Sequence, residues 1–147
     1  MADYFKTVTC SLVLSLGSAG VGLAVAPAPL EISGSWLRLP PPGAKVTAGY
    51  MTLHNSGNTA LTITSISTAK PAHVEIHNSR LSKSGQMSME HAPAITVAPG
   101  TTVRLAPAGM HAMIFDAPAL TAGETLDFTL ELQDGRQVKG AFTAQRP

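Results

Sequence analysis

Methionine and histidine, which offer a thioether sulfur and an imidazole nitrogen to a metal ion, gather in one part of this sequence. Beyond the initiator, all of them lie within residues 51–113. Copper(I) is a soft ion that accepts both donors, whereas zinc, calcium and magnesium sites make little use of methionine. The segregation therefore predicts a copper(I) site. The residues are Met51, Met87, Met89, Met110 and Met113, with His54, His73, His77, His91 and His111.

The strongest local pair is His111 and Met113, which lie two residues apart in a run typical of a β-strand. Side chains at i and i+2 of a strand project from the same face, so this imidazole and this thioether could bind one ion. A simpler interpretation of the pair alone stays open, in which Met113 fills the core and His111 is an exposed strand residue.

A second element is the run Val74 to His77, which a turn connects to Met87-Ser88-Met89. Val74 and Ile76 share one face, which we take as the core face, so that His77 turns outward. Folding the segment about Lys83 would bring His77 opposite Met89. The same register places polar residues on the core face, so a β-bulge or a longer loop stays open as an alternative. These residues are Gln86, Ser88 and Glu90.

The remaining composition limits the class of protein. The chain has 147 residues, of which 44% are hydrophobic and 13% charged, and its formal net charge is +1. This length suits one domain, and the low charge argues against nucleic-acid binding. One cysteine excludes an internal disulfide framework and a multi-cysteine zinc site.

Residues 1–26 are expected to form a signal peptide that is cleaved near Ala24 to Ala26, because an uncharged stretch follows Lys6 and ends in small residues. A retained membrane anchor is the alternative. Cys10 lies inside this segment, after Thr7-Val8-Thr9 rather than a lipoprotein-type run. The mature chain is then free of cysteine and has no stable membrane span, which excludes a blue-copper site with its thiolate ligand.

From Glu31 onward, short β-rich runs alternate with turns rich in Gly, Pro, Asn and Ser, which is typical of an all-β domain. We predict one antiparallel β-sandwich or barrel of about seven to nine strands over residues 29–147. Its aromatic residues, Trp36, Tyr50, Phe115, Phe128 and Phe142, are expected in the core or on sheet faces. The expected strands are Ile32–Leu39, Ala48–His54, Ala60–Thr68, His73–Asn78, Gln86–Glu90, Thr101–Leu105, His111–Phe115, Thr125–Leu132 and Gln137–Thr143.

The sequence resembles the PCu(A)C family of periplasmic copper chaperones. The family motif is His, about ten residues, Met, 21 residues, then His-x-Met; here 11 residues separate His77 from Met89, and 21 separate Met89 from His111. The one-residue difference leaves open whether Met87 replaces or assists Met89. The similarity spans roughly residues 29–143 and includes Trp36-Leu37-Arg38, Ala48-Gly49-Tyr50-Met51-Thr52-Leu53-His54-Asn55, Val74-Glu75-Ile76-His77, Pro99-Gly100 and Pro107-Ala108-Gly109-Met110.

The resemblance implies a cupredoxin-like Greek-key fold that binds one Cu(I) per monomer through His77, Met89, His111 and Met113. It also implies delivery of copper in the periplasm to the binuclear copper centre of cytochrome c oxidase or to a copper assembly protein. No arrangement typical of an enzyme is found, so we expect a non-enzymatic, monomeric carrier. The alternatives are copper storage or resistance, and a metal-free interaction module.

Other residues are assigned auxiliary roles. Met87, Met110, His73 and His91 are candidates for an auxiliary site, for which Cu(II) is a candidate ion, although each is more simply a surface or packing residue. Glu75 lies two residues from His77 and so on the same face of the expected strand, where it could orient the imidazole of His77. The simpler explanation is that Glu75 is a solvated surface residue. His54, beside Asn55 at a strand end, is expected to serve a turn.

Overall fold

The computed structural model describes residues 28–69 and 72–146, which contain ten β-strands and no helix. The predicted signal peptide lies outside these residues. All nine predicted strands are present, and the tenth is the short strand β6, which the sequence pattern did not indicate. The strands are β1 (Leu30–Arg38), β2 (Thr47–Asn55), β3 (Leu61–Thr68), β4 (His73–Leu81), β5 (Met87–His91), β6 (Ile95–Val97), β7 (Thr102–Leu105), β8 (Met110–Phe115), β9 (Thr125–Leu132) and β10 (Gln137–Gln145).

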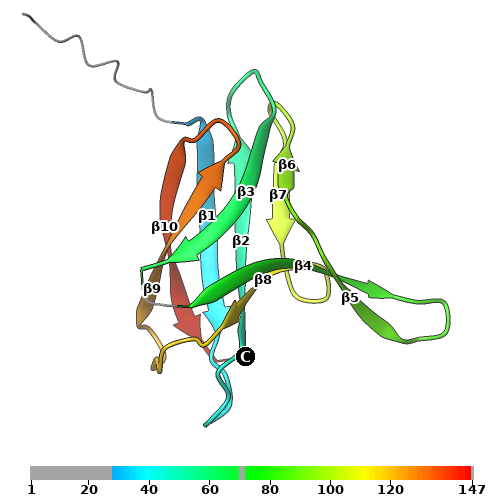
Figure 1. The fold of residues 1–147 in the computed structure, drawn as a ribbon, viewed down its shortest axis with the longest axis vertical. Coiled ribbons are helices and arrows are strands. Elements are labelled where there is room, and N and C mark those ends of the chain that lie inside the picture. The colour runs from blue at the N-terminus through cyan, green and yellow to red at the C-terminus, as the bar shows by residue number, and fades with distance from the viewer. Residues whose placement is uncertain (1–27, 70–71, 147) are drawn as a thin grey trace, which may run out of the picture.

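The strands form one continuous, open sheet in the order β5-β4-β8-β2-β1-β10-β9-β3-β6, and β7 also pairs with β2. The sheet coils into an elongated sandwich, so that β3 also contacts β4 (Figure 1). This confirms the predicted all-β sandwich; over the described residues the sheet does not close into a barrel. All pairings are antiparallel except that of β1 with β10, which is parallel.

Alternating apolar residues build the core. Every second residue of β9, beginning with Leu126 and Phe128, is buried, as the pattern predicts. The rings of Phe128 and Phe142 pack with their centroids 4.3 Å apart. Trp36 and Phe115 are only half-buried, and Trp36 packs on the buried Tyr50 with centroids 4.5 Å apart.

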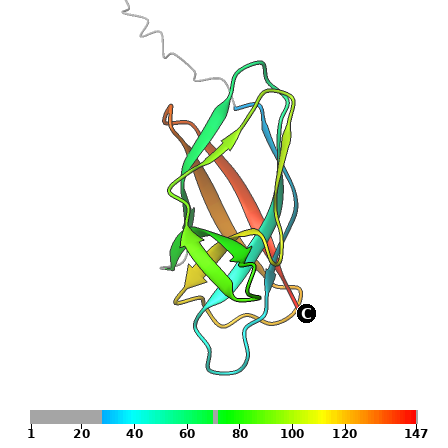
Figure 2. The same ribbon diagram turned by 90° about the vertical axis from the view of Figure 1, so that its right-hand side faces the viewer.

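The β4–β5 hairpin projects from the body of the sandwich (Figure 1), and Figure 2 views the molecule from that side. Its register differs from the prediction: Ser79, not His77, lies opposite Met89, and His77 lies opposite His91. The physical reason is the loop. The amide of Gln86 donates to the hydroxyl of Ser82, and the amide of Ser82 donates to the carbonyl of Gln86. The residue before Gln86, Gly85, has φ +82°. A three-residue loop with its last residue in the left-handed region therefore centres the hairpin on residue 84.

The projection also resolves the problem of polar residues on the core face of this hairpin. All of β5 is exposed, and it pairs with β4 without a bulge. The residues that share a face with Ile76 reach solvent beyond the core, where Arg80 and Glu90 approach to 3.6 Å. Among the described residues, no helix is long and apolar enough to cross a membrane.

Candidate metal centre

Strand β4 is the middle of a three-stranded patch, β5-β4-β8, which carries all four predicted ligands. His77 lies opposite His91 of β5 on one side and His111 of β8 on the other. Directly opposed residues of antiparallel strands share a face, and so do residues two apart on one strand. Met89 and Met113, each two residues from one of these histidines, therefore share that face. The opposite face, with Ile76, Ala112 and Ile114, packs into the core.

His77 is held at one ring nitrogen and unpaired at the other. Its Nε2 donates a hydrogen bond of 2.7 Å to the Glu75 carboxylate, and its side chain is only 15% exposed. Because a carboxylate only accepts, this contact puts the proton on Nε2 and leaves a lone pair on Nδ1. Nδ1 is buried and has no hydrogen-bond partner among the described residues. A buried, unpaired nitrogen is costly, and a metal ion at Nδ1 would satisfy it.

His111 is oriented by the backbone. The side chain is 5% exposed, and its Nδ1 lies 3.0 Å from the carbonyl oxygen of Gly109, to which it donates. Nε2 then carries the free lone pair. The ring centroids of His77 and His111 are 6.1 Å apart. Two imidazoles thus stand side by side, each with one nitrogen available to an ion.

Glu75 bridges two histidines. One carboxylate oxygen accepts from His77, and the other accepts a bond of 2.8 Å from Nε2 of the exposed His73. The hydrogen bond from His77, and then that from His73, lowers the pKa of the Glu75 carboxyl below its ordinary value. This carboxylate therefore stays ionised and orients His77, which is the role that its parity indicated and that solvation alone does not explain.

The thioethers lie on the exposed side of the patch. Met89 is 57% exposed and Met87 is 52% exposed, and both line a hollow of about 390 Å³ together with His111 and Met113. The structure brings Met87 to the same place as Met89, so it does not separate the two alternatives. His77 lies beside His111 and does not line the hollow.

Three other candidates lie elsewhere. Met110 and the buried Met51 pack with the core, and Met110 is on the face opposite the site. His54 Nδ1 is 3.0 Å from Oγ1 of Thr102, a contact between β2 and β7 rather than a turn. In the described ranges, no three His, Asp or Glu side chains are arranged to hold a metal ion by themselves.

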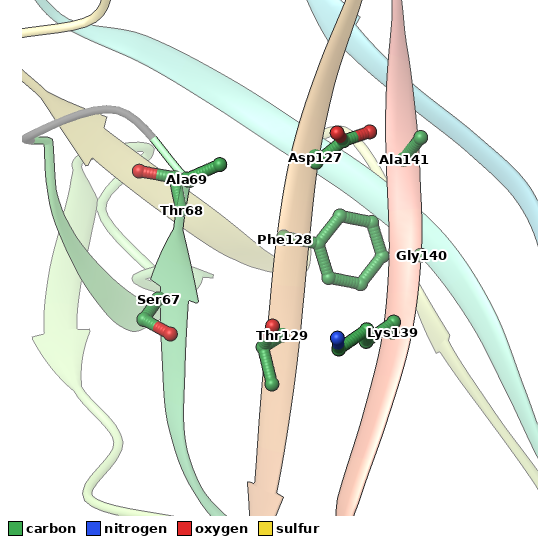
Figure 3. A pocket seen from close by; sticks show the side chains of 9 residues that line it. All are labelled: Ser67, Thr68, Ala69, Asp127, Phe128, Thr129, Lys139, Gly140 and Ala141. Carbon is green, nitrogen blue, oxygen red and sulfur yellow. The ribbon is translucent and has the colours of Figure 1, made fainter.

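A larger hollow lies away from this site. It measures about 620 Å³ and is bordered by β3, β9 and β10 (Figure 3). The ring of Phe128 lies against Gly140 there, and the lining contains no His or Met. A candidate site chosen by volume alone would therefore contain none of the methionines and histidines that could bind a soft metal ion. The full lining is Ser67, Thr68, Ala69, Asp127, Phe128, Thr129, Lys139, Gly140 and Ala141.

Comparison with known proteins identifies the family. Residues 30–144 match the family described as "Putative lipoprotein LpqE-like". The chain belongs to the LpqE-like family. It is similar to "Putative lipoprotein Lxx21020" of Leifsonia xyli subsp. xyli, with 26% identity over 108 residues; the match covers 72% of this chain and 63% of that relative's length.

Solved structures with the same fold include PCuAC domains. The copper-bound PCuAC domain from PmoF2 has a TM-score of 0.68 at 22% identity and covers 84% of this chain and 97% of that one. The solution structure of CuI-DR1885 from Deinococcus radiodurans has a TM-score of 0.61 at 28% identity and covers 87% and 83%. This LpqE-like chain therefore has the fold of PCuAC domains, which confirms the predicted cupredoxin-like β-sandwich.

Proposed function

We propose that this LpqE-like protein is a copper(I) carrier that binds one ion through His77, Met89, His111 and Met113. The observation that carries the proposal is the placement of these four side chains on one face of β5-β4-β8, beside the unpaired Nδ1 of His77. Two imidazoles and two thioethers suit copper(I). The similarity to CuI-DR1885 supports the choice of ion.

The proposed ligands differ in how firmly the fold holds them. His77 and His111 lie on paired inner strands and are oriented by hydrogen bonds, so they provide a fixed pair of nitrogens. Met89 lies on the edge strand β5 and is 57% exposed. An incoming soft ligand from an acceptor protein can replace this thioether without opening the core. The copper ion is thus cargo, and the chain is a carrier rather than an enzyme.

The recipient we propose is the binuclear copper centre of cytochrome c oxidase, or a copper assembly protein that serves it. The support is the PCu(A)C resemblance of the sequence and the PCuAC fold. Storage or resistance is the alternative that uses the same site. Copper transfer to an isolated oxidase copper domain separates the two, because a storage protein would retain the ion in the presence of that acceptor.

Export to the periplasm is part of the proposal. The predicted signal peptide supports it, and so do the family and the Leifsonia relative, both of which carry lipoprotein names. The mass of the mature chain distinguishes two placements. A start near Ala24 to Ala26 means a released protein without cysteine, whereas a start at a lipid-modified Cys10 means a membrane-anchored one. An uncleaved chain would indicate the retained membrane anchor in place of a released protein.

The direct test is anaerobic titration of the mature protein with Cu(I) against a chromophoric competitor. Wild type is expected to take up one ion, and His111→Ala and Met113→Ala are expected to weaken uptake by at least about tenfold. His54→Ala, a histidine away from the patch, is the matched control. Because His111 is buried, the circular dichroism of each variant must show a folded chain. The proposal fails if wild type takes up no Cu(I), or if folded ligand variants bind as wild type does.

A further inference from the structure

The exposed apolar side chains of this protein gather beside the candidate copper site. In the described part of the chain, every exposed large hydrophobic side chain belongs to the β4–β5 hairpin or to the residue just before β2. Single exposed hydrophobics are normal on a surface, whereas a cluster is typical of a binding surface. We call this cluster the apolar rim; it consists of Val46, Leu81, Met87 and Met89.

The apolar rim surrounds a concave surface built from two segments that are far apart in sequence. The β4–β5 hairpin faces the viewer in Figure 2, and the loop between β1 and β2 lies below it. Val46, Met87 and Met89 line the hollow of about 390 Å³, and Leu81 lies directly opposite Met87. His111 also lines this hollow. An apolar segment that fills the hollow therefore comes close to the proposed ligands.

The unpaired charges beside the apolar rim are positive. Arg38 lines the hollow and Lys83 lies in the hairpin loop, and neither forms an ion pair with a described residue. The carboxylates of β4 and β5 are already engaged, because Glu75 accepts from two histidines and Glu90 lies 3.6 Å from Arg80. Unpaired cations around an apolar surface favour a partner that carries carboxylates at the matching positions.

This charge distinguishes between two possible occupants of the surface. Two copies of the chain that paired through the same patch would bring two positively charged surfaces together, which disfavours the contact. A copper acceptor is the occupant that the carrier function requires. A protein that takes the ion directly must come within bonding distance of it, and the exposed thioether of Met89 is itself part of the apolar rim. The rim is therefore covered whenever copper is transferred.

We propose that the apolar rim, together with Arg38 and Lys83, is the docking surface for the copper acceptor, which meets it with an apolar surface bordered by carboxylates. The inference rests on the proposed carrier function and on the proposed recipient, the copper domain of cytochrome c oxidase. Burial of the rim holds the complex together, whereas the charges speed the encounter and lose their effect as the salt concentration rises. Of the proposed ligands, only Met89 also belongs to the rim.

The test measures copper(I) transfer from the loaded mature chain to an isolated oxidase copper domain, by anaerobic stopped-flow at several salt concentrations. Wild type is expected to transfer more slowly as the salt concentration rises. Arg38→Glu is expected to lower the second-order rate at low salt by about tenfold and to weaken its dependence on salt. Leu81→Ser is expected to raise the acceptor concentration for half-maximal transfer by about threefold to tenfold, because an apolar contact is lost.

Copper(I) affinity and a matched variant control this experiment. Neither Arg38 nor Leu81 is a proposed ligand and both are exposed, so each variant is expected to fold and to bind copper(I) as wild type does. Lys139→Glu makes the same reversal of charge at an exposed residue of β10, which borders the other hollow (Figure 3). It is expected to transfer copper at the wild-type rate.

Four results would overturn the inference: an Arg38→Glu or a Leu81→Ser variant that transfers copper as wild type does, an equal loss of rate in Lys139→Glu, a wild-type rate that does not fall with salt, or a wild-type dimer that Leu81→Ser dissociates. A loaded wild type that passes no copper to this domain overturns the inference together with the proposed recipient. Failure of the carrier proposal looks different, because there the wild-type protein takes up no copper(I) at all.

Discussion

Glu75→Ala is expected to weaken copper(I) binding although Glu75 is not a ligand. The carboxylate accepts the Nε2 proton of His77 at 2.7 Å and so selects the tautomer with a free Nδ1. Without it, the ring can turn and carry its proton on either nitrogen, so only part of the population presents the lone pair to the ion. Partners of this kind typically contribute 10–100-fold to metal affinity.

The exposure of the pair determines where in this range the effect should fall. The Glu75 side chain is 32% exposed and that of His77 is 15% exposed, so water can partly replace the lost contact. We therefore expect a loss at the lower end, about tenfold, which corresponds to about 1.4 kcal/mol. Glu75→Gln is expected to lose less copper(I) affinity, because the amide oxygen can still accept from Nε2 of His77. Only the contact with His73 is lost, since the amide NH₂ group cannot accept a hydrogen bond.

His73→Ala is the matched control for this experiment. It removes the 2.8 Å contact on the other oxygen of the same carboxylate and leaves the contact with His77 in place. Copper(I) affinity is measured by anaerobic competition, and urea unfolding of the metal-free variants checks that stability changes by no more than about 0.5 kcal/mol, as for other surface substitutions. The reasoning is refuted if Glu75→Ala binds copper(I) like wild type, or if His73→Ala loses as much.

Three further outcomes test the packing and charges of the fold. Gly140→Ala is expected to lower the free energy of unfolding by about 1–3 kcal/mol in urea denaturation, because the added Cβ would lie 2.5 Å from the ring of Phe128; an unchanged midpoint would contradict this packing. Asn55→Ala is expected to cost about 1–3 kcal/mol in the same assay, since its fully buried amide donates to two backbone carbonyls. Hydrogen bonds from Arg136 lower the pKa of Asp134, so Arg136→Ala is expected to raise that pKa in an NMR titration. Because the pKa is lowered by folding, the contribution of Asp134 to stability is present above the ordinary carboxyl range and is lost as the pH falls through the folded value.

The face of the site could be predicted from the sequence, but the partner of His77 could not. The prediction centred the hairpin on Lys83, and the structure centres it on residue 84. A shift of one residue in the centre moves the opposed residue by two, from Met89 to His91, and so preserves the face. This is why the four candidate ligands share a face although the register was wrong. The available signal was Gly85 at the third position of a three-residue loop, where a positive φ is required.

Strand β6 and the role of Glu75 show two other limits of the sequence pattern. β6 has only three residues, Ile95–Val97, between two prolines, which is too short for an alternation of buried and exposed residues to stand out. The two-residue spacing of Glu75 and His77 puts them on one strand face, but this spacing does not reveal whether the Glu75 side chain points to solvent or to its neighbour. That choice depends on side-chain rotamers and on His73, which only the folded strand brings within reach.

The position of each donor in the sheet explains how one site can both retain and release an ion. β8 and β4 each pair on both sides, so their histidines stay fixed while the body is folded. β5 pairs only with β4, and every one of its residues is exposed. Moving the exposed thioether of Met89 costs few buried contacts, whereas the rings of His77 and His111 are largely buried and held by hydrogen bonds. Ligand exchange with an acceptor should therefore begin at Met89 on the edge strand and end at the donors on β4 and β8. This order follows from the sheet topology rather than from the strength of any one metal bond.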